Sequence, residues 1–244
     1  MSKPAAPVNR LIASLASPGR LKFMASCEPV ELRFAEVLCE SGDPIRHVYF
    51  PTDSFISLVT ALDDRSRLEV GIVGDEGMLG ASLVLGVQVS PQHALVQGAG
   101  PALRMGAADF NRHCAQNAAL SDSLKRYTYV LMSQLAQTAA CTHFHGIELR
   151  LARWLLLTRD RAHSNKFRLT QEFMAYMLGV RRVGITQAAS MLQARGMIDY
   201  RRGEIVIRDA ARLEKASCDC YQQGNDMYEQ TMGKPRRALV SLVR

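Results

Sequence analysis

Residues 30–105 alternate between apolar and polar positions in short runs, as strands with one buried face do. Val30, Leu32 and Phe34 begin the pattern, with polar residues between them. Further β-prone runs, separated by turn residues, span residues 47–50, 55–59, 68–73, 94–97 and 102–105. Short strands at regular spacing predict a sandwich or jelly roll. Residues 77–85 do not alternate, and we expect a short helix and loop over the barrel mouth there.

Residues 117–144 have a helical pattern and contain neither Pro nor Gly. A heptad-like apolar stripe is formed by Leu120, Leu124, Tyr127, Leu131 and Leu135. Two interpretations are open: the stripe packs on its own barrel, or it is a self-association seam. We favour the seam and a homodimer, because a long helix between two domains has little core of its own.

Residues 169–207 predict two short helices followed by a hairpin. Thr170 can cap the first helix, and Gly179 can adopt the left-handed conformation between the helices. The second helix is predicted over residues 181–194, with its buried side formed by Ile185, Ala188, Ala189 and Leu192. This is the pattern of a helix-turn-helix. Residues 198–207 add a hairpin with arginines at its tip, the wing of a winged helix.

The net charge of +7 comes from one segment. Residues 145–212 carry 13 Lys and Arg against 6 Asp and Glu, whereas residues 1–144 carry 12 against 13. A basic domain joined to a neutral one indicates a polyanionic partner, and the helix-turn-helix makes double-stranded DNA the predicted one.

The exposed side of the second helix offers residues that fit the major groove: Arg181, Arg182, Val183, Thr186, Gln187 and Ser190. Arg can pair bidentately with guanine, and Gln with adenine. Arg181, Arg201 and Arg202 are assigned to phosphates, and Thr170 completes the predicted DNA-binding set. A solvated basic face on an ordinary helical hairpin is the alternative, but it does not account for the wing and the charge excess together.

The six cysteines, at positions 27, 39, 114, 141, 218 and 220, form no Cys-x-x-Cys pair. The sequence therefore indicates neither a zinc ribbon nor a disulfide framework. Cys218 and Cys220 could together bind a metal, but no His or Cys partner lies near them in sequence. We predict no metal and no cofactor. The chain has no phosphate-binding Gly-rich loop, no Gly-x-Ser-x-Gly elbow and no His-Glu-x-x-His, so it is not expected to be an enzyme.

Membrane insertion is not expected. The residues that follow Met1 contain no apolar core of signal-peptide length. The longest weakly polar stretch, residues 77–89, is interrupted by glycines and is shorter than the roughly 20 residues that span a bilayer. We therefore expect a cytoplasmic protein.

Residues 169–172, 178–182, 192–198 and 200–203 resemble the Crp/Fnr superfamily of bacterial regulators. The barrel resembles that family less specifically, at residues 42–43 and 74–80. The resemblance implies an α+β fold with a cyclic-nucleotide-binding-like β-roll (1–115), a long dimerisation helix (116–145), a winged helix-turn-helix (146–215) and a helical tail (216–244). It also implies regulation through contact with RNA polymerase.

The positions that correspond to the cyclic-AMP site depart from the family pattern. Cyclic-AMP sensors of the family use a Gly-Glu pair for the ribose and an Arg-Ser pair for the phosphate. This chain has Gly80 and Ala81 at the first pair and Gln92 and His93 at the second. The carboxylate and the guanidinium clamp are missing, so cyclic-AMP sensing of the usual kind is not expected. These four residues are the effector-pocket candidates.

Other family sensors fit the sequence no better. Only Cys27 and Cys39 lie in the first third of the chain, too few for the cysteine cluster of the iron–sulfur oxygen sensors. In the recognition helix, Val183 replaces the usual Glu and Gln187 replaces the second Arg, so the target sequence should differ from the usual half-site.

Three functions follow from these departures. The first is a transcription regulator controlled by an unidentified small molecule, and the second is a regulator whose barrel is a ligand-free scaffold. The third, a cyclic-nucleotide regulatory subunit of another protein, is disfavoured by the intact wing. From Leu213 onward we predict an added helix, and residues 234–237 are a basic run that we expect to be solvated.

Overall fold

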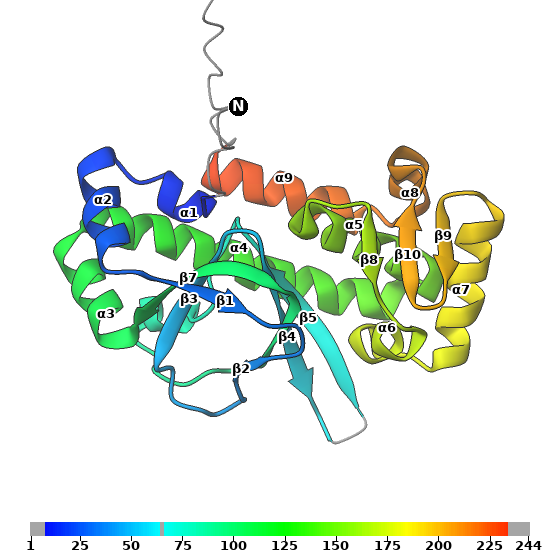
Figure 1. Ribbon diagram of the computed structural model, residues 1–244, viewed down its shortest axis with the longest axis horizontal. Coiled ribbons are helices and arrows are strands. Elements are labelled where there is room, and N and C mark those ends of the chain that lie inside the picture. The colour runs from blue at the N-terminus through cyan, green and yellow to red at the C-terminus, as the bar shows by residue number, and fades with distance from the viewer. Residues whose placement is uncertain (1–7, 64–65, 234–244) are drawn as a thin grey trace, which may run out of the picture.

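The computed structural model describes residues 8–63 and 66–233, which form a β-rich N-terminal domain, a long central helix and a small C-terminal domain (Figure 1). The N-terminal strands are β1 (Glu28–Leu32), β2 (Val37–Cys39), β3 (His47–Pro51), β4 (Phe55–Ala61), β5 (Arg67–Val73), β6 (His93–Gly98) and β7 (Gly100–Gly106). They form two antiparallel sheets, in the orders β1-β7-β3 and β2-β6-β4-β5. Leu32, Ile56, Val73 and Val96 belong to one buried cluster of this domain. The predicted β-roll is confirmed.

Four short helices border the roll: α1 (Arg10–Ala13), α2 (Ser17–Ala25), η1 (Ala81–Leu85) and α3 (Ala107–Gln116). The short helix expected within residues 77–85 is η1. Asn9 fixes the N-terminal helices to the roll, because its buried Nδ2 donates hydrogen bonds to the carbonyl oxygens of Pro51 (2.9 Å) and Gly77 (2.8 Å).

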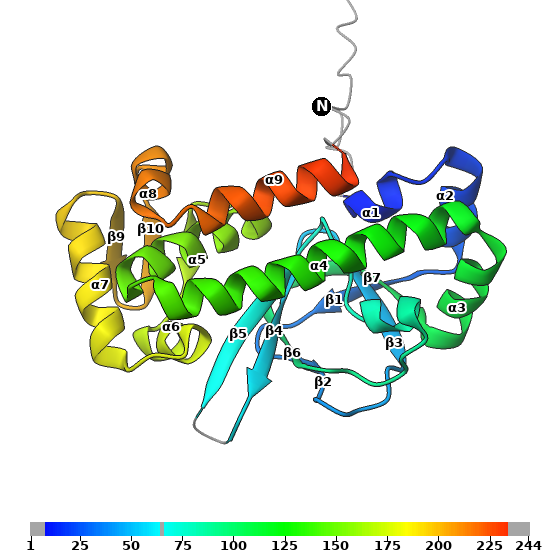
Figure 2. The ribbon, with the colours of Figure 1, turned by 180° about the vertical axis from the view of Figure 1, so that it is seen from behind.

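Helix α4 (Ala118–Phe144) runs along the molecule and joins its two domains (Figure 2). Asn117 caps it, accepting a hydrogen bond from the backbone N–H of Leu120 at 3.1 Å. The assignment of its apolar stripe to a dimer seam was wrong. Leu120, Leu124 and Tyr127 are buried in the core of their own N-terminal domain.

The rest of that stripe also faces the roll. The side chains of Leu131 and Leu135 lie over Gly71 of β5. The stripe therefore packs on its own barrel, which was the alternative interpretation, because burying these side chains within the chain removes them from water without a partner.

The C-terminal domain contains α5 (Ile147–Ala162), β8 (Lys166–Arg168), α6 (Gln171–Leu178), α7 (Arg182–Ala194), β9 (Ile198–Arg201), β10 (Glu204–Ile207) and α8 (Ala210–Ala216). Its strands form an antiparallel sheet in the order β8-β10-β9. Leu155, Met174, Ile185, Leu192 and Ile205 share one buried core. This is the predicted winged helix-turn-helix, and with it the α+β architecture is confirmed.

A last helix, α9 (Cys220–Met232), turns back and lies beside α4, so that its end comes close to α1 (Figures 1 and 2). The hydroxyl of Tyr228 donates a 3.0 Å hydrogen bond to the carbonyl oxygen of Glu76, and Arg10 lies over the Tyr228 ring. Within the described residues, the predicted tail contains the helix α9, and the basic run at residues 234–237 lies outside them. Within the described part of the chain, no helix is long and apolar enough to cross a membrane.

Candidate DNA-binding surface and effector cavity

The helix-turn-helix is held by local contacts that the sequence specifies. Oγ1 of Thr170 accepts a 3.1 Å hydrogen bond from the N–H of Phe173 and so caps α6. Gly179 ends α6 in the left-handed conformation (φ 62°, ψ 40°), and the N–H of Val180 bonds the carbonyl of Ala175 at 3.0 Å. These contacts set α7 across α6.

Helix α7 buries Ile185, Ala188, Ala189 and Leu192, as predicted, and its opposite face is exposed. The exposed residues of that face and its start are Arg181, Arg182, Val183, Thr186, Gln187 and Ser190. Thr186 is partly engaged, because its hydroxyl donates a 2.8 Å hydrogen bond to Oε1 of Gln171 at the start of α6. Gln171 was not among the predicted site residues, although its place in the first turn beside Thr170 is visible in the sequence.

The wing is a two-residue hairpin. Arg201 pairs with Glu204, and Arg202 and Gly203 between them have φ angles of 51° and 76°. Two central residues with positive φ define a turn whose twist matches the strands. The fold therefore holds Arg202 at the tip, where it is exposed.

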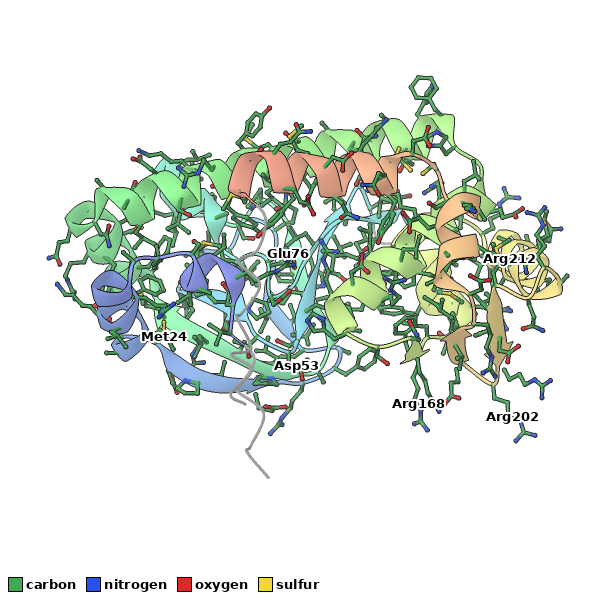
Figure 3. The ribbon with its side chains drawn as sticks, turned by 90° about the horizontal axis from the view of Figure 1, so that it is seen from above. Met24, Asp53, Glu76, Arg168, Arg202 and Arg212 are labelled. Carbon is green, nitrogen blue, oxygen red and sulfur yellow. The ribbon has the colours of Figure 1, made fainter. Side chains whose placement is uncertain are left out.

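Arg168 on β8 lies in the groove beside the wing, together with Arg201 and Arg202. Figure 3 shows Arg168 and Arg202 projecting from the same edge of the domain. Arg168 belongs to the basic segment of residues 145–212, but it was not among the predicted site residues. Its place beside the wing depends on the pairing of β8 with β10.

The arginines of this surface differ from other arginines of the domain in their pairing. Arg195 forms an ion pair with Glu148 (2.8 Å), and Arg208 pairs with Asp199. Among the described residues, no ion pair involves the exposed residues Arg168, Arg181, Arg182, Arg201 and Arg202. The surface formed by α7 and the wing therefore carries unneutralised positive charge, the property of a polyanion-binding face.

A cavity of about 500 Å³ lies between the roll, η1 and the middle of α4. Gly80, Ala81 and Gln92 line it, together with Arg46, Ser90 and Thr128. Its size is that of a small-molecule site. Gly80 has φ 93°, and an added Cβ would come within 2.9 Å of Val48, so this position requires glycine.

His93 is not part of the cavity wall. Its Nδ1 lies 2.6 Å from Oε2 of Glu40, and the ring is held in that pair. Of the four predicted effector-pocket residues, Gly80, Ala81 and Gln92 therefore line the cavity, and His93 does not. The wall also contains Cys39, whose thiol donates to Oγ of Ser90 at 3.3 Å.

The three N-terminal cysteines have the character of structural thiols. Burial raises the pKa of Cys27 to about 12 and that of Cys114 to about 11, and it also raises the pKa of Cys39. A thiol that stays protonated is a poor nucleophile and a poor redox sensor.

The comparisons with known proteins agree with this architecture. Residues 149–216 match the Crp-like helix-turn-helix domain family. No curated protein matches the chain significantly in sequence. FixK2 from Bradyrhizobium japonicum has a similar structure, with a TM-score of 0.67, 15% identity, and coverage of 79% of this chain and 98% of that one.

Two further solved structures are similar. A putative Crp/Fnr-family regulator from Eubacterium rectale gives a TM-score of 0.66 at 15% identity, covering 87% of this chain and 97% of that one. CLP, a c-di-GMP-responsive global regulator from Xanthomonas campestris, gives 0.58 at 14% identity, covering 79% and 99%.

The fold matches that of solved Crp/Fnr-family regulators. The C-terminal domain is a Crp-like helix-turn-helix, and the predicted resemblance to the Crp/Fnr superfamily is confirmed.

Proposed function

We propose that this protein is a sequence-specific transcription regulator that binds a palindromic DNA site as a homodimer. The observation that carries the proposal is the exposed, unpaired arginine set shared by α7 and the wing. A regulator of this kind acts on DNA in the cytoplasm and works through contact with RNA polymerase.

The recognition roles follow from position. Arg182 and Gln187 on the exposed face of α7 read base edges in the major groove, and Val183, which is 60% exposed, contacts a thymine methyl. Arg181, Arg201 and Arg202 bind phosphates, and Arg168 joins them because it projects beside the wing. Ser190 and Thr170 lie at the edges of this surface.

The homodimer forms through a face of α4 that the roll leaves uncovered. Its exposed residues at heptad spacing are Tyr129, Met132, Ala136 and Ala139. Two of these are large apolar side chains, with Tyr129 56% and Met132 59% exposed. The alanines allow a second helix to approach closely, so this seam replaces the stripe chosen from the sequence.

The cavity beside α4 binds a small molecule. It does not bind cyclic AMP in the way that the cyclic-AMP sensors of the family do. Ala81 has no carboxylate for a ribose, and Gln92 has no guanidinium for a cyclic phosphate. An effector there would touch η1 and Thr128 of α4, and so couple the roll to the helix that joins the domains. The second candidate function is a regulator whose roll binds no ligand and serves as a scaffold. The missing carboxylate and guanidinium favour it, but the size of the cavity does not.

The test is fluorescence anisotropy with duplexes enriched by in vitro selection, across a salt series, for the wild type and Arg182→Ala. We expect a palindromic preference, and a loss of about 1–3 kcal/mol of preference at one base pair per half-site in the variant. Sequence-independent binding that is unaffected by Arg182→Ala would overturn the assignment of α7.

Cyclic AMP, cyclic GMP and cyclic di-GMP are added in turn to the same titration. Stronger DNA binding with cyclic AMP would contradict the conclusion that Ala81 and Gln92 cannot hold this nucleotide. If none of the three changes the affinity, other small molecules are screened, and a complete absence of response supports the scaffold.

A further inference from the structure

Four side chains able to bind a metal meet where α4 ends. Cys141 lies in the last turn of α4, and His145 caps the same helix. Cys220 is the first residue of α9, and Cys218 lies two residues before it. The ligating atoms of all four lie within 4.8 Å of one another. No metal was predicted from the sequence, because Cys141 is 77 residues away from Cys218 along the chain. The return of α9 along α4 brings the two segments together.

The separations fit four ligands around one ion. The Sγ atoms of Cys141 and Cys218 are 3.5 Å apart, and Sγ of Cys220 lies 3.6 Å from Nδ1 of His145. Tetrahedral zinc with Zn–S bonds of about 2.3 Å and Zn–N bonds of about 2.0 Å has edges of about 3.5–3.8 Å. A disulfide needs about 2.05 Å between its sulfurs, and all six cysteines of this structure are free.

The surroundings of the cluster suit a charged thiolate site. Cys141, Cys218 and Cys220 are each at most 6% exposed. Nε2 of Gln137 donates a 3.0 Å hydrogen bond to Sγ of Cys220, as an outer-shell group does to a metal-bound thiolate.

Positive charge lies beside the sulfurs. Arg150 and Arg153 line the same small cavity, of about 60 Å³, as Cys141 and Cys220. Three thiolates and a neutral imidazole around a divalent ion carry a net charge of about −1, which these guanidinium groups offset.

We propose that Cys141, His145, Cys218 and Cys220 bind one Zn²⁺ ion that fastens α9 to the junction of α4 and α5. Three sulfurs and one imidazole select zinc over magnesium or calcium, which take oxygen ligands. Four protein ligands leave no open coordination position, so the site is structural.

The position of the ion explains what it stabilises. The junction of α4 and α5 is where the chain passes from the central helix into the DNA-binding domain. Arg150, which lines the cavity beside the cluster, donates a hydrogen bond to the carbonyl oxygen of Leu178 at the end of α6. Zinc therefore stabilises the α4–α5 junction, which connects the central helix to the helix-turn-helix domain, and it holds α9 against α4.

The experiment measures metal content in the full chain, purified under reducing conditions and loaded with Zn²⁺ before desalting. We expect about one zinc per chain by elemental mass spectrometry. Cys218→Ser and Cys220→Ser should retain at most about a tenth of that. Cys220→His should retain the ion because imidazole is also a zinc ligand, and Cys114→Ser, outside the cluster, is the matched control.

Two further readouts keep the test independent of how the variants fold. Co²⁺ added to the metal-free wild type should give the intense visible absorption of a tetrahedral thiolate site, and Zn²⁺ should abolish it. Chelation should lower the melting temperature of the wild type and of Cys114→Ser, but not that of Cys218→Ser.

The proposal is overturned if the loaded wild type holds no more zinc than Cys218→Ser, or if Co²⁺ gives no thiolate spectrum. A Cys141–Cys218 disulfide found by mass spectrometry in the reduced and loaded protein would also overturn it. None of these measurements involves DNA, so the result is separate from that of the proposed function.

Discussion

The indole Nε1–H of Trp154 on α5 donates a 2.7 Å hydrogen bond to Oε1 of Glu69 on β5. This bond joins the DNA-binding domain to the roll, and both side chains are buried. Burial raises the pKa of Glu69 to about 7, although hydrogen bonds with Ser57 and Trp154 and the charge of Arg161 favour its ionised form. The domain contact therefore contains a carboxyl group that titrates near neutral pH.

The stability of the protein should fall as the pH rises through the pKa of Glu69. The folded-state pKa lies above the ordinary value of 4.5, so the folded state holds the proton more tightly than the unfolded state. This contribution is complete below pH 4.5 and is lost as the pH passes about 7. The loss amounts to up to about 3 kcal/mol in the free energy of unfolding.

Urea unfolding at about pH 5 and about pH 8 measures this difference. Glu69→Gln keeps an acceptor for Trp154 and should flatten the dependence, whereas Glu31→Gln, at an exposed position of β1, should leave it as in the wild type. An unchanged pH dependence in Glu69→Gln would show that another group is responsible.

Charge placed on the exposed face of α4 should separate the proposed homodimer. Met132→Glu combined with Ala136→Glu puts two carboxylates into the proposed seam, so we expect a monomer in sedimentation equilibrium and weakened DNA binding. The folded monomer should remain, because both positions are exposed.

The matched control for the seam is Leu124→Ala, from the stripe that the sequence suggested. Leu124 is 1% exposed in its own domain, so its truncation should cost about 2–5 kcal/mol of stability without changing the oligomeric state. A dimer that survives the double substitution but is lost in Leu124→Ala would reverse the assignment.

Gly179 of the helix-turn-helix lies against the roll, and its substitution should lower the free energy of unfolding more than substitution of Gly196. Gly179→Ala strains a residue with φ 62° and places a Cβ 3.2 Å from Leu68 and 3.3 Å from the carbonyl oxygen of Arg67. Gly196 has φ 69° and no neighbour within 4 Å, so Gly196→Ala adds only the backbone strain of about 1–2 kcal/mol. Chemical denaturation measures the free energy of unfolding of both variants. Equal decreases would mean that the roll accommodates the new methyl group of Gly179→Ala without loss of stability.

Arg202 at the tip of the wing and Arg168 on β8 should bind phosphates and not read bases. Arg202→Ala and Arg168→Ala should each weaken binding to all sequences and lower the slope of log affinity against log salt by about 1. Arg112→Ala, on α3 and paired with Asp109, should leave the slope unchanged. A loss confined to the preferred sequence would instead make either arginine a base-reading residue.

The helix-turn-helix was predictable because its determinants are local. The cap at Thr170, the turn at Gly179, the buried stripe of α7 and the arginines of the wing lie within 39 consecutive residues, 169–207. Each depends on conformational preference or on the period of a helix, and both are properties of neighbouring residues. The charge excess of the same segment, which favours DNA as partner, is likewise a property of composition.

Only the tertiary structure decided which face of α4 is left exposed, where His93 points and which residues meet at the junction of α4 and α5. An apolar stripe at heptad spacing is satisfied equally by a barrel or by a second helix, because burial rewards area and not the identity of the partner. The pair of His93 with Glu40 and the cluster of Cys141, His145, Cys218 and Cys220 both join residues far apart in the chain. Such contacts are set by how the elements pack, and no local pattern in the sequence encodes them.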